Sequence, residues 1–220
     1  MDHALLAGLS DAHRQELLTK ARRRRFRTRE VVFHEGDPAD SVHLVMSGRF
    51  AARSTTAMGR VAIYALFGPR GLFGELAMVD QEAIRSATVY ALEPGETISL
   101  GRDQFDSVRS ANPHADRLLV EILAAKVRAA SGVLVEALCE RAEVRVLRRL
   151  VFAAEFWGAL EPGGGTVALT QDDLSGFAGT TRPTVNKVLI EIERAGLIRT
   201  RRGRIDILDP EGLCRRAAAV

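Results

Sequence analysis

Residues 169–187 read LTQDDLSGFAGTTRPTVNK, and this stretch decides how the C-terminal part of the chain folds. Thr170 and Asp173 form the Ser/Thr-x-x-Asp/Glu capping box that opens a helix. We expect this helix to end at Gly179, and a second helix to begin after one of the two threonines that follow. Pro183 then lies in the first turn, where a missing N–H breaks no helical hydrogen bond. Two short helices joined by a glycine-containing turn are typical of a helix-turn-helix.

The second helix, expected to run to about Ala195, has two chemically different faces. The back face is apolar and would pack on the core of its own domain; it consists of Val185, Val188, Leu189 and Ile192. On the other face, Arg182 can form two hydrogen bonds with guanine, and Asn186 can do so with adenine. A recognition helix in the major groove contacts base edges with its N-terminal residues in this way. A solvated basic surface on an ordinary helix pair is the alternative interpretation.

Residues 197–208 predict two short strands around a turn at Arg202 and Gly203, as in the wing of a winged helix. The chain has a formal net charge of only +3, but residues 181–204 hold seven Lys or Arg, Arg204 included, and two acidic residues. Such local positive charge attracts DNA phosphates whatever the base sequence. We therefore expect double-stranded DNA to contact Thr170, Gln171, Thr181, Arg182, Pro183, Thr184, Asn186, Lys187, Arg199, Arg201 and Arg202.

Short apolar runs separated by turn residues fill residues 31–100. Clear runs begin at Val42, Val61 and Ala87, and Gly, Pro or Asp residues lie between them. Strands at this spacing are typical of a sandwich, a barrel or a roll.

Residues 112–140 change to a helical pattern, with Asn112 expected as the N-cap and Pro113 as the first helical residue. Apolar residues recur at spacings of three and four, as in a coiled coil. These positions, here called the heptad seam, are Val120, Leu123, Val127, Ala130, Leu134 and Ala137. A second apolar stripe is expected to pack on the helix's own domain; it consists of Leu119, Ile122, Val133 and Leu138. The two stripes favour a helix that joins two copies of the chain. Packing within one domain alone is the simpler alternative.

The composition excludes several classes of protein. Of the 220 residues, 46% are hydrophobic, which is enough for a core. No apolar run approaches about 18 residues, and Asp2 stands where an export signal would carry bases, so we expect a cytoplasmic protein that binds no membrane. Cys139 and Cys214 lie far apart and indicate unpaired thiols. No nucleophile elbow, P-loop or metal-ligand spacing is present, so we expect no enzyme activity.

Three segments together resemble the cyclic-AMP receptor / fumarate-nitrate regulator (CRP/FNR) family of bacterial transcription regulators. They are residues 33–49, residues 73–88 and residues 169–198. The resemblance implies an α+β protein of three parts. These are a cyclic-nucleotide-binding, jelly-roll-like β-roll at residues 1–111, a dimerisation helix at residues 112–142 and a winged helix-turn-helix domain at residues 143–220. It also implies a homodimer that binds a pseudo-palindromic operator and contacts RNA polymerase.

Within residues 73–88, the resemblance implies a phosphate-binding cassette for a cyclic nucleotide, cAMP more than cGMP. Gly74 would let backbone N–H groups approach the phosphate, and Arg85 would pair with it through the planar guanidinium group. Glu75 would accept a hydrogen bond from the ribose 2′-hydroxyl. The implied ligand residues are Phe73, Gly74, Glu75, Leu76, Ala77, Arg85, Ser86, Ala87 and, on the long helix, Ser131. The alternative is a plain Glu75–Arg85 salt bridge, in a regulator that needs no ligand or senses another effector.

The chain departs from the family pattern in places. In members that respond to cAMP, a Thr-Ser pair on the long helix contacts adenine, whereas this chain has Ala130 and Ser131. Pro183 stands where relatives often carry Glu, so the operator is expected to differ. The cysteine cluster of the iron–sulfur members is absent and the histidines form no ligand pair, so we expect no iron–sulfur cluster, metal or haem. A cyclic-nucleotide module of an enzyme or channel is a remote alternative. We expect the basic run at residues 20–29 to form a solvated lead-in to the first strand.

Overall fold

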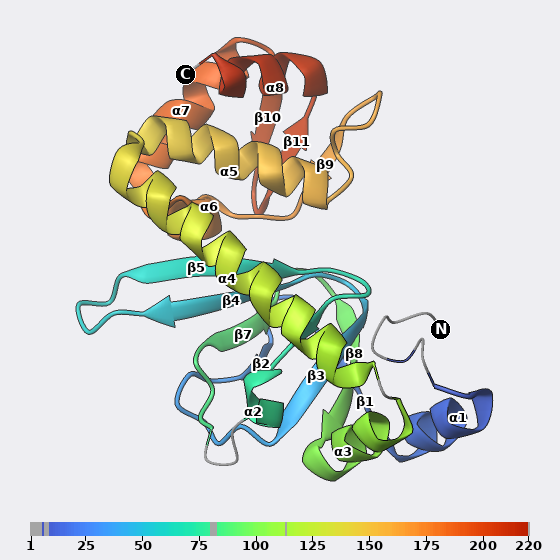
Figure 1. Ribbon diagram of the computed structural model, residues 1–220. Helices are drawn as coiled ribbons and strands as arrows, with labels where there is room; N and C mark the ends of the chain where they lie inside the picture. Colours follow the sequence, from blue (N-terminus) through green and yellow to red (C-terminus); the bar gives the residue numbers. More distant parts are fainter. Residues whose placement is uncertain (1–5, 7–8, 80–82, 113, 220) are drawn as a thin grey trace. The chain divides into compact units, whose positions relative to one another are not determined.

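The computed structural model describes residues 6, 9–79, 83–112 and 114–219, and the chain separates into two compact units (Figure 1). The first unit comprises residues 1–54 and 65–130, and the second comprises residues 55–64 and 131–220. The acidic start at Asp2 and the expected helix start at Pro113 lie outside the described residues. Among the residues that the structure describes, no helix is both long enough and apolar enough to cross a membrane.

Two four-stranded antiparallel sheets form the roll that residues 31–100 predict. The first has the strand order β1-β8-β3-β6 and the second β2-β7-β4-β5. The strands are β1 (Arg22–Phe26), β2 (Val31–Phe33), β3 (Ser41–Ser47), β4 (Phe50–Thr55), β5 (Val61–Phe67), β6 (Leu72–Phe73), β7 (Thr88–Ala91) and β8 (Gly95–Gly101). The helices of this unit are α1 (Asp11–Lys20), α2 (Leu76–Val79), α3 (Arg102–Ala111) and the first part of α4 (Ala115–Cys139).

Side chains of the central strands point alternately to two cores, as the pleat requires. Leu44 and Ile98 face one core, which also contains Phe105 of α3. Val45 faces the other core, which lies inside the roll and contains Phe50. The α+β roll expected from the sequence is therefore confirmed.

The first strand lies earlier in the chain than the apolar pattern predicts. Arg22–Phe26 form β1, which pairs with β8 along its whole length, whereas we expected these residues to be only a lead-in to a strand near Val31. Four consecutive arginines hide the alternation of a strand, because only Phe26 is buried. The expected exposure of the basic run is seen, since Arg22 to Arg25 are all exposed.

The long helix is present, and the Asn112 side-chain Oδ1 accepts from the His114 N–H at 3.0 Å, as expected of an N-cap. Asn112 is also the C-cap of α3, its N–H donating to the Val108 carbonyl at 2.9 Å, and α4 begins at Ala115. Leu119 and Ile122 pack against the core of the first unit, as expected. Leu138, expected to pack on its own domain, is instead 76% exposed.

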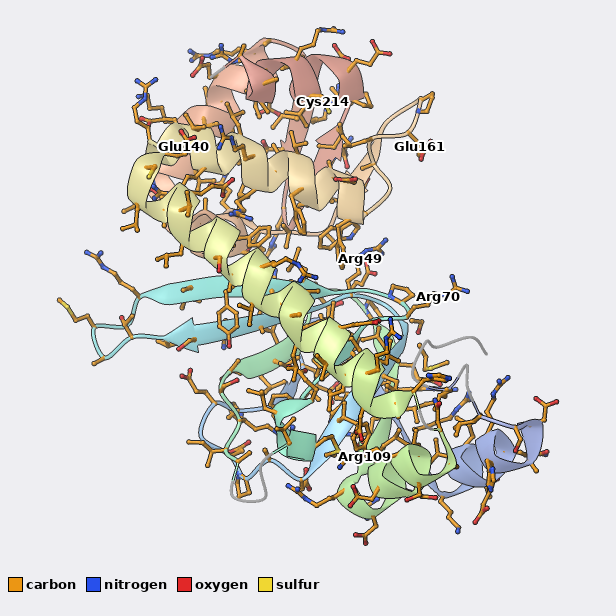
Figure 2. The ribbon with its side chains drawn as sticks, viewed as in Figure 1. Arg49, Arg70, Arg109, Glu140, Glu161 and Cys214 are labelled. Carbon is orange, nitrogen blue, oxygen red and sulfur yellow. The ribbon has the colours of Figure 1, made fainter. Side chains whose placement is uncertain are left out.

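The second unit contains the predicted helix-turn-helix and wing. Its helices are the end of α4, α5 (Ala142–Phe156), α6 (Gln171–Ala178), α7 (Arg182–Arg194) and α8 (Pro210–Ala218). Its strands are β9 (Gly165–Val167), β10 (Ile198–Arg201) and β11 (Arg204–Ile207), in the sheet order β10-β11-β9. Gly179 ends α6 in the left-handed conformation, and Thr181 caps α7. Strand β9 and helix α8, which carries Cys214 (Figure 2), extend the predicted motif.

The capping box of α6 is complete. The Asp173 N–H donates to Thr170 Oγ1 at 3.0 Å, and the Thr170 N–H donates to Asp173 Oδ2 at 2.8 Å. We expect Thr170→Ala to lower the free energy of unfolding by about 1 kcal/mol, because one helix-end N–H loses its acceptor. Thr170→Ser keeps the hydroxyl and should lie close to the unsubstituted protein. Urea unfolding of the three proteins measures the difference, and equal midpoints for all three would show that the cap contributes nothing.

Candidate functional site

Gly74 allows the cassette to close tightly around Arg85. It follows β6 directly and has a φ of +81°, which side chains other than hydrogen rarely allow. A Cβ atom at this position would lie 2.7 Å from Arg85 Nη1 and 2.9 Å from the Ser41 carbonyl oxygen. Only glycine therefore fits this position without moving its neighbours.

Arg85 is 5% exposed and is held by two residues at the start of β3. Its Nη1 donates to the Ser41 carbonyl oxygen at 2.7 Å, and its Nη2 donates to Asp40 Oδ1 at 3.0 Å and to Ser41 Oγ at 3.0 Å. The guanidinium carbon lies 4.1 Å from the centroid of the Phe33 ring. Burial lowers the pKa of Arg85 and Asp40 opposes this shift, so the group remains a cation at neutral pH.

One donor of Arg85 is left over. Its Nε is buried and has no hydrogen-bond partner among the described residues. A buried, charged donor without an acceptor is costly, and such an atom calls for an explanation. A phosphate oxygen is a suitable acceptor for an arginine whose other nitrogens are already fixed in place. The residues present therefore fit the phosphate of a nucleotide.

Glu75 has a partner that the sequence analysis did not single out. Lys126 of α4 donates from Nζ to Glu75 Oε2 at 2.6 Å, and its ammonium group lies 5.2 Å from the centroid of the Phe67 ring. Glu75 is 6% exposed. The ion partner of Glu75 is thus Lys126 and that of Arg85 is Asp40, so the plain Glu75–Arg85 bridge considered as an alternative is not what holds these groups. The sequence signal for this partner was Lys126 itself, a single lysine in the helix predicted at residues 112–140.

The other expected ligand residues divide by exposure. Those that are buried, and so form the frame of the cassette, are Phe73, Ala77 and Ala87. Leu76 is 42% exposed, and Ser86 is also exposed. Ser131 is exposed on the part of α4 that belongs to the second unit, so its contact with a ligand stays a prediction.

His43 is a buried residue of the roll, close to Arg85. Its ring stacks on Phe73 with centroids 5.1 Å apart, and its Nδ1 lies 3.1 Å from Thr97 Oγ1. Burial, with the charges of Arg85 and Arg24, lowers the pKa of His43 to about 3. The imidazole is therefore neutral at physiological pH.

This shift predicts an acid-sensitive fold. An unfolded histidine has a pKa of about 6.5, so between pH 6.5 and 3 the unfolded chain binds a proton that folded His43 does not. The free energy of unfolding should fall as the pH drops below 6.5, by about 2 kcal/mol at pH 5. His43→Gln should remove most of this dependence and His34→Gln, at an exposed position, should keep it. Urea titrations from pH 7.5 to pH 4.5 test this, and equal slopes for both variants would contradict it.

The helix-turn-helix presents the predicted DNA-contact residues on its surface. Arg182, Asn186 and Lys187 are exposed on α7, whereas its apolar back face is buried, with Val185, Val188, Leu189 and Ile192 each at most 3% exposed. Gln171 Nε2 of α6 lies 3.4 Å from Asn186 Oδ1, so the two helices place these amides together. Thr181 and Pro183 are exposed, and Thr170 and Thr184 are half-buried.

Two exposed arginines of the wing, Arg201 and Arg204, lie within ion-pair distance of Asp206. Arg201 Nε donates to Asp206 Oδ2 at 2.6 Å across the hairpin. Arg199, Arg202 and Arg204 are exposed. The two ion pairs of α7 are loose and exposed to solvent. Arg182 lies 3.6 Å from Asp172, and Lys187 lies 3.6 Å from Glu143. Such pairs are weak and can open to phosphate or bases.

A β-roll and a winged helix-turn-helix in one chain together define the class of DNA-binding regulators with a sensor domain. Residues 23–112 match the family model of the cyclic nucleotide-binding domain, and residues 144–216 match the Crp-like helix-turn-helix domain. The chain is 30% identical over 189 residues to the CRP-like cAMP-activated global transcriptional regulator of Mycobacterium tuberculosis, covering 85% of this chain and 84% of that protein. It is 29% identical over 204 residues to the cyclic AMP receptor protein of Thermus thermophilus, covering 92% and 91%.

A solved structure shows the same fold at lower identity. The c-di-GMP responsive global regulator CLP of Xanthomonas campestris matches with a TM-score of 0.76 at 20% identity, covering 91% of this chain and 99% of that one. The chain belongs to the CRP/FNR family of transcription regulators, with a cyclic nucleotide-binding domain and a DNA-binding helix-turn-helix domain.

Proposed function

We propose that this protein is a homodimeric, sequence-specific transcription regulator controlled by a cyclic nucleotide, cAMP rather than cGMP. The observation that carries the ligand is the buried Arg85 Nε, which has no partner among the described residues, on an arginine whose Nη1 lies against Gly74. The cyclic phosphate would accept from this donor, and Glu75 would accept from the ribose 2′-hydroxyl. Relatives described as cAMP-activated and as a cyclic AMP receptor support cAMP.

The ligand would act through Glu75. This carboxylate is bonded to Lys126 of α4, so a ribose hydroxyl would share or replace that bond. A ligand shifts a conformational equilibrium only by its difference in affinity for the two states. We propose that this exchange at Lys126 shifts the position of α4 and thereby the position of the DNA-binding domain.

The dimer interface would be the heptad seam within the proposed helix at residues 112–142. Val120, Val127 and Leu134 are between 59% and 66% exposed in the single chain. Large apolar side chains in a row on one helix face are typical of an interaction surface. The flanking parts would be the sensor at residues 1–111 and the DNA-binding domain at residues 143–220.

The DNA contact would run along α7 and the wing. Arg182, Asn186 and Lys187 would read bases, while Arg199 and Arg202 would attract phosphates. Two copies related by a two-fold axis would bind a pseudo-palindromic operator with half-sites about one helical turn apart. RNA polymerase is the proposed further partner.

Selection of bound DNA from a random pool, with and without cAMP, tests the whole proposal. We expect a palindromic sequence that is enriched only, or far more strongly, with cAMP. Calorimetric titration with cAMP and cGMP tests the ligand directly. No heat with either nucleotide at millimolar concentration would reject nucleotide control and leave the DNA-binding role standing.

One observation favours a second candidate, a regulator with a different effector. Ala130 has no polar atom for an adenine edge, where cAMP-responsive relatives are expected to carry Thr. The structural neighbour from Xanthomonas campestris is described as c-di-GMP responsive, so this fold accommodates other effectors. The same DNA selection, repeated with c-di-GMP in place of cAMP, separates the two candidates.

A further inference from the structure

The interior of the roll is apolar at one end and polar at the other. Phe26 and Val45 belong to the apolar end. Further along the same face of the first sheet, Arg22 lies opposite Ser99, and Ser99 lies opposite His43. Residues that pair directly across strands point to the same side of a sheet. These polar side chains therefore occupy positions that would otherwise complete the core.

A cavity of about 790 Å³ opens at this polar end. Its lining includes the cationic side chains of Lys20, Arg22, Arg24 and Arg85, against the carboxylates of Asp37 and Asp40. Two of these cations have ion partners, since Lys20 pairs with Glu16 at 2.6 Å and Arg85 pairs with Asp40 at 3.0 Å. The neutral imidazole of His43, which also lines the cavity, adds no charge.

Two of these cations have no counter-ion. Within the described part of the chain, the Arg22 side chain has no ion pair. Arg24 has one hydrogen bond of 3.4 Å, to the Val32 carbonyl oxygen, and its guanidinium carbon lies 4.9 Å from the Phe26 ring centroid. On the opposite face of the same strand, Arg23 and Arg25 both pair with Glu96, at 3.5 and 3.0 Å. The two outer arginines thus share one carboxylate partner, whereas the two inner arginines have none among the described residues.

We propose that this cavity is a second anion-binding site, which takes a small molecule with two neighbouring phosphate groups. Arg22 and Arg24 are two residues apart on one strand face, so their Cα atoms are about 7 Å apart. Two planar guanidinium groups at this spacing can each bind one phosphate. The hollow shape favours a small molecule, which can enter the cavity. The cavity shares Arg85 with the cassette, but Arg22 and Arg24, which would bind the two phosphates, are not among the ligand residues proposed there.

Calorimetric titration with inorganic pyrophosphate tests this site. The unsubstituted protein should bind, and the double variant Arg22→Ser with Arg24→Ser should bind about 100-fold more weakly, because each charge-assisted contact contributes about tenfold. The double variant Arg23→Ser with Arg25→Ser is the matched control. It removes the same charge from the other face of β1 and should bind within about threefold of the unsubstituted protein.

Three results would overturn the proposal. They are no heat with the unsubstituted protein, undiminished binding by the inner double variant, and equal weakening by both double variants, which would indicate general charge attraction only. The substituted arginines are all exposed, so the variants should fold. Thermal melting of each variant checks this before the titrations are compared.

Discussion

The variant Arg85→Gln is expected to give no measurable heat with cAMP at concentrations that saturate the unsubstituted protein. Glutamine removes both the positive charge and the Nε donor that has no partner among the described residues. A charge-assisted hydrogen bond to a phosphate contributes about 1.5–3 kcal/mol, so losing the Nε bond alone weakens binding by about 10- to 150-fold. Calorimetry measures the loss.

Arg49→Gln is the matched control for this variant. Arg49 is another partly buried arginine of the first unit, paired with Glu93 at 2.8 Å, and we propose no ligand contact for it. It should bind cAMP as the unsubstituted protein does. Arg85→Gln should also keep its DNA affinity in the absence of ligand. If Arg85→Gln binds cAMP normally, the phosphate does not lie at Arg85 and the cassette proposal fails.

The second large effect is expected at the recognition helix. Replacing Arg182 and Asn186 together with alanine should abolish the preference for operator over random DNA. Each side chain can bind one base edge with two hydrogen bonds, which discriminate by about 1–3 kcal/mol each, so specificity should fall by about 30-fold to more than 1,000-fold. Competition binding with operator and random duplexes measures the ratio.

Two single variants separate base reading from charge. Arg199→Ala in the wing should weaken binding to all sequences alike and lower the slope of log K against log salt by about 1. Arg215→Ala on α8, where the arginine pairs with Glu211 at 3.3 Å, removes an equal charge and should change neither. A double variant of Arg182 and Asn186 that keeps full operator preference would place recognition elsewhere.

The parts of the fold that local chemistry determines were predictable from sequence. The α6 cap at Thr170, the turn at Gly179 and the apolar back of α7 depend on spacings of a few residues, and the structure confirms them. Strand β1 was not predicted, because four consecutive arginines show no apolar alternation. Their strand conformation depends on pairing with residues of β8 that lie more than 70 positions further along the chain. The part of Asn112 in ending α3 was not predicted, because asparagine suits the end of one helix as well as the start of another, and Asn112 takes part in both.

The candidate site was predictable in its residues but not in its partners. Gly74, Glu75 and Arg85 carry the resemblance to the cassette, and the structure places Gly74 against Arg85. Their partners, Lys126 and Asp40, lie 51 and 45 positions away from Glu75 and Arg85. Tertiary folding alone brings such groups together, so no local pattern indicates which cation or carboxylate will be chosen.

The tight approach at Gly74 gives a way to sort related sequences before any measurement. A chain with this roll but with alanine at the position of Gly74 would force its arginine and the β3 backbone apart. We expect that change only in relatives whose arginine does not bind a phosphate. Presence or loss of this single glycine should therefore divide the relatives into those that still sense a nucleotide and those that have turned the same scaffold to another signal.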